Sequence, residues 1–191
     1  MIKLTICTPS IPSRIDSHLK PLMDNINRQI ESIPKPMQVE HLVLIDNKRR
    51  SIGMKRQTLL NSANGEYIAF IDDDDSVSDD YVFQLWYACK QDVDVITFNQ
   101  HVWLNGVGPH PLTFKLGHPT NEGVSMEGCT RPPWHVCAWK HTIAKQCKYT
   151  NKMYGEDWDW VKQANKLAKT SHHIDKTICS YNFSESVTEA I

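Results

Sequence analysis

The chain has 191 residues, of which 40% are hydrophobic and 23% are charged, and its formal net charge at pH 7 is -1. These values are typical of one globular domain that is large enough to bury a core of its own. A net charge this small excludes a strong global attraction to polyanions. Charge is nevertheless unevenly placed, because six aspartates stand in residues 72–80 and basic residues cluster in residues 48–56 and 140–152.

Six cysteines are spread along the chain without a CxxC pair, which argues against a disulfide framework or a zinc ribbon. Zinc bound by Cys129, His135 and Cys137 is a weak alternative, because their spacing matches no established zinc pattern. The N-terminus enters a strand-like run at once, without a signal peptide, and no apolar stretch approaches about 20 residues. We therefore expect a soluble cytoplasmic protein with no integral membrane association.

Strand-like and helical patterns alternate along the first half of the chain. Short apolar runs predict buried strands over residues 3–8, 39–45, 66–71 and 93–98. Helical spacing of apolar residues predicts helices over residues 15–30, 51–63 and 78–89, with Ser13, Ser51 and Ser78 as their caps. This alternation predicts an α/β fold with a mostly parallel, Rossmann-like sheet flanked by helices.

The pattern changes in the second half of the chain. Residues 101–129 are punctuated by glycine and proline, which predicts irregular strands and loops that shape a second ligand site. Helical spacing returns over residues 157–168, and Ile174 and residues 178–183 are predicted to be closing strand pieces. We expect a single domain over residues 1–191.

The apolar run Tyr67–Ile71 passes directly into four consecutive aspartates, Asp72–Asp75, which we call the acidic exit. Adjacent carboxylates repel one another unless a cation or hydrogen-bond donors compensate them. Ligand crevices of α/β sheets open at the carboxyl ends of strands. Because oxygen ligands suit Mg²⁺ and Mn²⁺, we expect a divalent cation that carries a phosphorylated ligand at this point. A solvated acidic loop that caps the next helix is the structural alternative.

With this strand and its acidic exit placed, the sequence resembles the nucleotide-sugar glycosyltransferases of the GT-A fold, particularly the inverting family 2. The resemblance spans roughly residues 1–165 and is carried by Thr8–Arg14, Arg56-Gln57, Gly65-Glu66-Tyr67, Asp72–Asp75 and Gly155-Glu156-Asp157-Trp158. The segments TPSIPSR and SIGMKRQ further resemble compact phage-encoded transferases, which implies the host cytoplasm. One departure is that Asp46, after the second strand, is followed by Asn47 and Lys48 instead of a second acid.

The resemblance implies transfer of a sugar, with inversion, from a nucleotide diphosphate sugar such as UDP-glucose to a hydroxyl acceptor. The donor half is expected in residues 1–100, and the acceptor and catalytic half in residues 101–191. Mn²⁺ or Mg²⁺ is expected on Asp74 and Asp72. Donor contacts are expected from Thr8, Pro9, Arg14, Asp46, Arg56, Asp72 and Asp73.

Asp157 is the expected base for the acceptor hydroxyl, and Glu156 is expected to position it. Capping of a helix is the alternative role for both carboxylates. The acceptor side is expected to include Trp134, His135 and Trp158, whose rings can stack on a sugar or a base, and core packing is their alternative. Whether His172 or His173 reaches the metal stays open.

The preferred acceptor is a 5-hydroxymethylpyrimidine in phage DNA, such as 5-hydroxymethylcytosine, because basic residues and tryptophans accompany the expected site. A cell-surface glycan or a lipid-linked acceptor is the alternative within the same activity. Two other classes are an enzyme of nucleotidyl or phosphoryl transfer and a non-catalytic protein that binds sugar nucleotides. The first lacks a glycine-rich phosphate loop and leaves Glu156 and Asp157 without a role.

Overall fold

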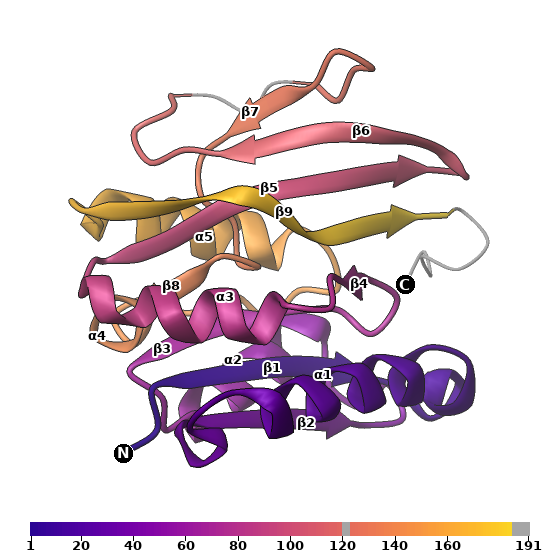
Figure 1. Ribbon diagram of the computed structural model, residues 1–191. Coiled ribbons are helices and arrows are strands. Elements are labelled where there is room, and N and C mark those ends of the chain that lie inside the picture. The colour runs from indigo at the N-terminus through magenta and orange to yellow at the C-terminus, as the bar shows by residue number, and fades with distance from the viewer. Residues whose placement is uncertain (120–122, 185–191) are drawn as a thin grey trace.

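The computed structural model describes residues 1–119 and 123–184, in which strands and helices alternate (Figure 1). The strands are β1 (Leu4–Ser10), β2 (Val39–Ile45), β3 (Tyr67–Phe70), β4 (Ser76–Val77), β5 (Val95–Leu104), β6 (Val107–Phe114), β7 (Cys129–Arg131), β8 (Ala138–Lys140) and β9 (Ser171–Phe183). The α-helices are α1 (Lys20–Ser32), α2 (Ile52–Ser62), α3 (Tyr81–Ala88), α4 (His141–Ala144) and α5 (Glu156–Leu167). The α/β class expected from the alternating pattern is confirmed.

The nine strands of residues 1–119 and 123–184 belong to one sheet, in the order β2-β1-β3-β8-β5-β6-β7, and β9 pairs with β5 and β4. In Figure 1, α1 and α3 pack together on the near face of the sheet, while α2 and α5 lie behind it. The strand β1 is buried along its whole length, since it lies between β2 and β3 and is covered on both faces. Burial on both faces accounts for its apolar residues Leu4, Ile6 and Cys7.

The first three strands of the expected sheet are confirmed, because β1 runs parallel to both β2 and β3. Ser51 caps α2 as predicted, and its Oγ accepts a hydrogen bond from the backbone N–H of Met54 at 3.2 Å. The predicted caps Ser13 and Ser78 are wrong. Ser13 lies inside a 3-10 turn that leads through a π-helical turn into α1, and the hydroxyl of Ser78 donates to Asp80 Oδ1 instead.

The second half of the sheet is mixed, whereas the sequence predicted a mostly parallel sheet. The short strand β8 runs antiparallel to both β3 and β5, and β9 runs parallel to β5. The strands β5 and β6 form an antiparallel hairpin, so the prediction of irregular pieces over residues 101–129 is wrong for this part. Asn105 and Gly106 turn the hairpin with positive φ angles of 50° and 79°, which is the backbone that an Asn-Gly pair favours.

Two long-range contacts fix where the ends of β1 and β3 open. The backbone N–H of Ile71 donates to the carbonyl of Cys7, and that of Phe70 donates to the carbonyl of His135, at 3.0 and 3.3 Å. The acidic exit therefore leaves the sheet beside the segment that precedes β8. Residue 100 lies inside β5, so the expected division into a donor half and an acceptor half is one of function, and it stays a prediction.

None of the helices in the described part of the chain combines the length and the apolar character needed to cross a membrane.

Gly53 sets how closely α2 approaches the loop before α5. A Cβ atom at this position would lie 1.9 Å from the carbonyl oxygen of Thr150. The backbone N–H of Gly53 donates to the backbone carbonyl of Lys152 at 3.2 Å. We expect Gly53→Ala to lower the free energy of unfolding by about 1–3 kcal/mol, because the methyl group must push the helix and the loop apart. Urea denaturation measures this difference.

The matched control is Gly123→Ala, since a Cβ at that position meets nothing within 4 Å. Its free energy of unfolding is expected to stay within about 0.5 kcal/mol of the wild-type value. Equal stability of the two alanine variants would contradict the close packing of α2 on residues 150–152.

Candidate active site

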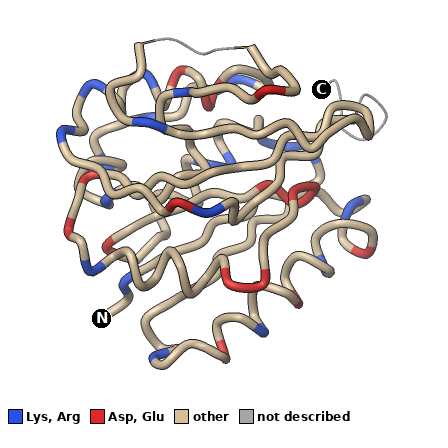
Figure 2. The backbone as a smooth tube through the Cα atoms, turned by 45° about the horizontal axis from the view of Figure 1, so that its top comes forward, with Lys and Arg blue, Asp and Glu red and all other residues tan. Residues whose placement is uncertain are grey.

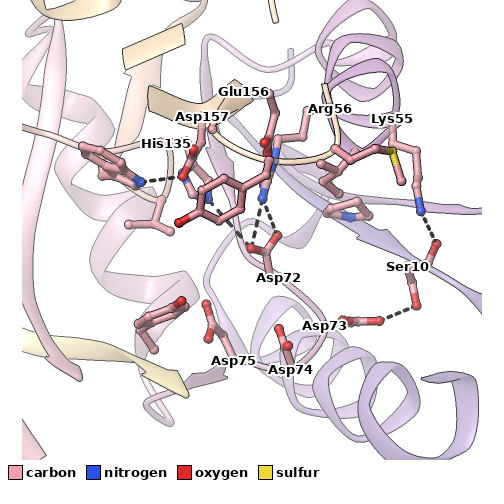
Figure 3. A pocket seen from close by; sticks show the side chains of 18 of the residues that line it. Ser10, Lys55, Arg56, Asp72, Asp73, Asp74, Asp75, His135, Glu156 and Asp157 are labelled. Carbon is pink, nitrogen blue, oxygen red and sulfur yellow. Dashed lines mark hydrogen bonds and ion pairs between the residues drawn. The ribbon is translucent and has the colours of Figure 1, made fainter. Parts of the chain in front are cut away.

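A cavity of about 580 Å³ opens at the carboxyl ends of β1 and β3 (Figure 3). Most of its lining comes from five parts of the chain: the end of β1 with the loop after it, residues 48–56, the acidic exit, residues 131–136 and residues 153–158. Gln100 on β5, Phe114 on β6 and Tyr181 on β9 complete it. Asp72–Asp75 and the pair Glu156 and Asp157 all line it. The two sets of carboxylates that the sequence singled out are therefore brought to one site.

Arg56 connects these two sets of carboxylates. Its guanidinium Nη2 lies 3.0 Å from Asp72, and its Nε donates to Glu156 Oε1 at 3.1 Å (Figure 3). The side chain is only 4% exposed, and it lies over the ring of Phe70 at 5.7 Å. A buried charge needs partners of opposite sign, and Arg56 has two.

Electrostatics in this cluster follow from burial and from the arginine. Burial works to lower the pKa of Arg56, but Asp72 and then Glu156 outweigh it and hold the pKa above its ordinary value. Burial also raises the pKa of Glu156, against the opposing effect of Arg56. The pKa of Asp72 is lowered, because the charge of Arg56 and its hydrogen bond outweigh the burial of the carboxylate. Asp72 is therefore the most firmly ionised acid beside Arg56.

The other three aspartates of the acidic exit are held by residues from other parts of the chain. Asp73 accepts hydrogen bonds from Ser10 Oγ at 2.6 Å and from Arg14 Nη1 at 2.7 Å. The Nη2 atom of Arg14 lies 3.2 Å from Asp74. The backbone N–H of Asn182, on β9, donates to Asp75 Oδ1 at 3.1 Å. These contacts explain how four consecutive acids hold one conformation.

The partners do not neutralise the acidic exit. The pKa of Asp74 is raised to about 6, first by burial and then by the charge of Asp72, although Arg14 lowers it. Burial, with Asp72 and Asp74, raises the pKa of Asp75 well above its ordinary value. Burial is the larger cause for both acids, so ionising them is costly unless a cation lies nearby.

The carboxylate oxygens of the acidic exit suit a hard divalent cation as ligands, since a nearby positive charge stabilises the ionised form of acids whose pKa values are raised. In residues 1–119 and 123–184, however, no three acidic, histidine or cysteine side chains converge closely enough to hold a metal ion as they stand. Asp72 and Asp74 are the residues of this set that the sequence predicted as ligands, and Arg14 now lies against Asp74.

Asp157 is held at the first turn of α5, which begins after Gly155 with its φ of 76°. Its Oδ2 accepts a hydrogen bond from the indole N–H of Trp134 at 2.9 Å, and its Oδ1 accepts one from the backbone N–H of Trp158 at 2.7 Å. The two indoles stack with their centroids 5.4 Å apart. The carboxylate of Asp157 is therefore oriented on both oxygens.

His135 lies between the two acidic sets. Its Nδ1 is 3.6 Å from Asp157 Oδ2 and its Nε2 is 4.0 Å from Asp72 Oδ2. Burial, and then Arg56, lower the pKa of His135 to about 4, although Asp157 and Asp72 work in the opposite direction. The imidazole is thus neutral near pH 7.

Most of the predicted site residues line the cavity. They are Pro9, Arg14, Arg56, Asp72, Asp73, Asp74, Trp134, His135, Glu156, Asp157 and Trp158. His135 lines the cavity but is only 6% exposed, so its ring offers little face for stacking on an acceptor, whereas Trp158 is 40% exposed. Which ligand each residue contacts stays a prediction.

Thr8 and Asp46 are not part of the cavity lining, so the prediction of direct donor contacts needs correction for both. Thr8 is fully buried, and its hydroxyl bonds to the ring of His41 on β2 at 2.9 Å. Asp46 lies behind Lys55, whose Nζ is 3.3 Å from Asp46 Oδ1 and donates to the carbonyl of Ser10 at 3.2 Å. Asp46 thus acts on the cavity through Lys55.

Sequence reasoning missed Ser10, Tyr181 and Asn182. Ser10 is the last residue of β1, and its position at a strand end beside a proline-rich loop was a usable signal. Tyr181 lines the cavity, and Asn182 donates its side-chain amide to the carbonyl of Asp74 at 3.2 Å. Both come from the end of β9, and no local pattern indicates that this strand reaches the acidic exit. His173, at the other end of β9, bonds to Thr97 instead.

The fold and the cavity together place the protein in the class of GT-A-type α/β domains. The family model described as "Glycosyl transferase family 2" matches residues 22–127, which is more than half of the chain. The chain therefore belongs to glycosyl transferase family 2, as the resemblance in its sequence indicated. Among curated proteins, none matches the sequence significantly.

Solved structures of S. aureus TarS share the fold. TarS 1-349 superposes with a TM-score of 0.71 at 16% identity, over 95% of this chain and 60% of that one. The complex of TarS 1-349 with UDP-GlcNAc gives 0.70 at 15% identity over 96% and 59%, and the complex with UDP gives 0.71 at 17% identity over 96% and 61%. The chain thus spans about 60% of the length of TarS 1-349.

The raised pKa of Asp74 predicts a measurable effect on stability. A carboxyl whose pKa rises on folding, here from 3.8 to about 6, stabilises the fold at low pH and loses that contribution as pH rises through 6. In the presence of EDTA, we expect Asp74→Asn to melt at a higher temperature than wild type above pH 6. The difference should shrink as the pH falls toward 3.8.

Thermal denaturation across this pH range, followed by circular dichroism, tests the expectation. Asp79→Asn is the control, since its side chain is 88% exposed and its substitution should give no such pH-dependent difference. A lower melting temperature of Asp74→Asn at neutral pH would show that the ion pair with Arg14 outweighs the repulsion.

Proposed function

We propose that the chain is a metal-dependent glycosyltransferase that moves a sugar from a UDP-linked donor, such as UDP-glucose, to a hydroxyl group with inversion. The observation that carries the proposal is that one cavity holds the acidic exit with its basic partners and, separately, the oriented carboxylate of Asp157. Leaving-group charge and acceptor deprotonation are the two needs of this reaction. The shared fold of TarS, crystallised with UDP-GlcNAc and with UDP, supports a UDP-linked donor.

The donor side of the cavity suits a nucleoside diphosphate. Arg14 and Lys55 are cations within the lining, and their donor groups are already directed at acidic and carbonyl oxygens. A diphosphate offers the same kind of acceptor, in the geometry that guanidinium groups bind best. Ile11 and Ile52 give the neighbouring wall an apolar surface for a base. A Mn²⁺ or Mg²⁺ ion held by Asp72 and Asp74 would neutralise the charge that develops on the departing diphosphate.

The acceptor side suits proton removal by Asp157. Each oxygen of this carboxylate accepts one hydrogen bond and keeps a second lone pair, so it can still accept the proton of an incoming hydroxyl. The hydroxyl oxygen then attacks the anomeric carbon from the face opposite the diphosphate, and the configuration inverts. Arg56 binds Glu156 at the start of α5 and also binds Asp72. The base and the leaving-group site are therefore held relative to each other by the same side chain.

We further propose a 5-hydroxymethylpyrimidine base in DNA as the acceptor. At the cavity mouth, Trp158 and Tyr154 are exposed aromatic residues, and Lys48 and Arg50 are exposed cations in the lining. Such a rim supports stacking of an extruded base and contacts to phosphate. Basic residues are otherwise dispersed over the described backbone (Figure 2), so the contacts would be local to this mouth. A cell-surface glycan or lipid-linked acceptor is the alternative, and a non-catalytic sugar-nucleotide-binding role is the alternative from another class.

Mass spectrometry of acceptors tests the function directly. The protein, Mn²⁺ and either UDP-glucose or UDP-GlcNAc are incubated with hydroxymethylated DNA, unmodified DNA and a panel of glycans. The expected result is a mass gain of one sugar on hydroxymethylated DNA alone. Transfer to a glycan alone would favour the alternative acceptor, and UDP binding without transfer to any acceptor or to water would favour the non-catalytic role.

Metal dependence is tested by binding. We expect UDP to bind wild-type protein more tightly in Mn²⁺ than in EDTA, because the cation joins the acidic exit to the diphosphate. In Asp74→Ala the affinity in Mn²⁺ should fall to the level measured in EDTA, whereas the exposed control Asp79→Ala should behave as wild type. Calorimetry that shows full metal-dependent affinity in Asp74→Ala would reject Asp74 as a ligand.

The base is tested by Asp157→Asn, which keeps the shape of the side chain and one of its two accepted hydrogen bonds but removes its proton affinity. We expect donor affinity to be unchanged and transfer to fall by about 10²–10⁴-fold. Asp159→Asn is the matched control on the same helix, since Asp159 pairs with Lys152 and Lys162 outside the cavity. Near-normal turnover of Asp157→Asn would remove it from the role of base.

A further inference from the structure

Both ring nitrogens of His135 are buried without a hydrogen-bond partner among the described residues. A carboxylate oxygen of Asp157 lies 3.6 Å from Nδ1 and one of Asp72 lies 4.0 Å from Nε2, and both distances are beyond hydrogen-bond range. A buried polar atom that is left unpaired costs free energy, and native proteins keep few of them. His135 therefore has hydrogen-bonding capacity that the protein by itself leaves unused.

The two carboxylates are poor partners for this ring. A neutral imidazole has one N–H donor and one lone-pair acceptor, whereas ionised Asp72 and Asp157 only accept. One of the two nitrogens must therefore present its lone pair toward a carboxylate. A group that both donates and accepts would satisfy the ring and a neighbouring acid together, and a hydroxyl group has this property.

The surroundings fix His135 in this position. Its carbonyl accepts the backbone N–H of Phe70 at 3.3 Å, and its ring meets the ring of Phe70 edge-on, with centroids 6.4 Å apart. The preceding residue, Trp134, is tied to Asp157 by its indole N–H. The ring of His135 is thus fixed before any ligand binds, with its nitrogens facing two carboxylates that line the same cavity, which lowers the entropic cost of recognition.

The position of His135 in the cavity also indicates which hydroxyl group can bind to its ring. His135 lies between Asp72, on the side of the departing diphosphate, and Asp157, on the side of the incoming alcohol (Figure 3). In the proposed reaction the transferred sugar must occupy the space between these two sides. We propose that His135 binds one hydroxyl group of the transferred sugar and so helps to select that sugar, an inference that rests on the proposed function.

Calorimetry with sugar nucleotides tests this inference in the presence of Mn²⁺. The ligands are UDP, UDP-glucose, UDP-GlcNAc and the monodeoxy analogues of whichever sugar nucleotide the wild-type protein binds. The proteins are wild type, His135→Phe, which keeps a ring without nitrogens, and His135→Gln, which keeps a donor and an acceptor. His141→Phe is the control, because His141 also has an unpaired buried nitrogen but lies outside the cavity.

The expected result is that His135→Phe binds UDP as wild type does but binds the parent sugar nucleotide about tenfold more weakly. One deoxy analogue should bind wild type and His135→Phe equally, which identifies the hydroxyl. His135→Gln should recover part of the loss, and His141→Phe should bind every ligand as wild type does.

Two outcomes would overturn the inference and leave the proposed function standing. One is equal binding of the parent sugar nucleotide by wild type and His135→Phe. The other is a loss of the same size for UDP and for every analogue, which would assign His135 a structural role. Failure of wild-type protein to bind UDP or any sugar nucleotide would instead reject the proposed function, and the inference with it.

Discussion

The site depends on one buried cation. Arg56 is shared by Asp72, at the end of β3, and Glu156, at the start of α5, which stand on segments far apart in the chain. Removing one partner from a buried ion pair typically costs about 3–5 kcal/mol, because the other charge stays buried and unpaired. This penalty couples the two halves of the cavity, because α2 places one guanidinium between the two acidic sets.

The four aspartates are arranged by the same principle of distributed partners. Ser10 and Arg14 hold Asp73, Arg14 also pairs with Asp74, and the end of β9 holds Asp75, but burial and the neighbouring acids still raise the pKa values of Asp74 and Asp75. The fold thus supplies enough compensation to fix the loop and too little to neutralise it. Binding of a cation would stabilise a site of this kind, which connects the arrangement of the aspartates to the proposed chemistry.

Local signals in the sequence were sufficient for the parallel strands β1 to β3, for α2 and α5, and for both sets of carboxylates. Apolar runs, a serine cap and an abrupt acidic exit are properties of neighbouring residues. What failed depended on distant pairing: the short strand β8 between β3 and β5, the reach of β9 to Asp75, and Thr8, which faces His41. Asn105-Gly106 was a local signal that was overlooked, and it explains the hairpin missed between β5 and β6.

The contact between β9 and the acidic exit has a consequence for the order of assembly during translation. Asn182 follows Asp75 by 107 residues, and its backbone and side chain hold Asp75 and the carbonyl of Asp74. Chains emerge from the ribosome N-terminus first, so the aspartates leave the ribosome well before β9, the strand that holds them. The nascent polypeptide therefore carries its acidic loop without the contacts from Asn182, and these contacts form only once β9 has docked.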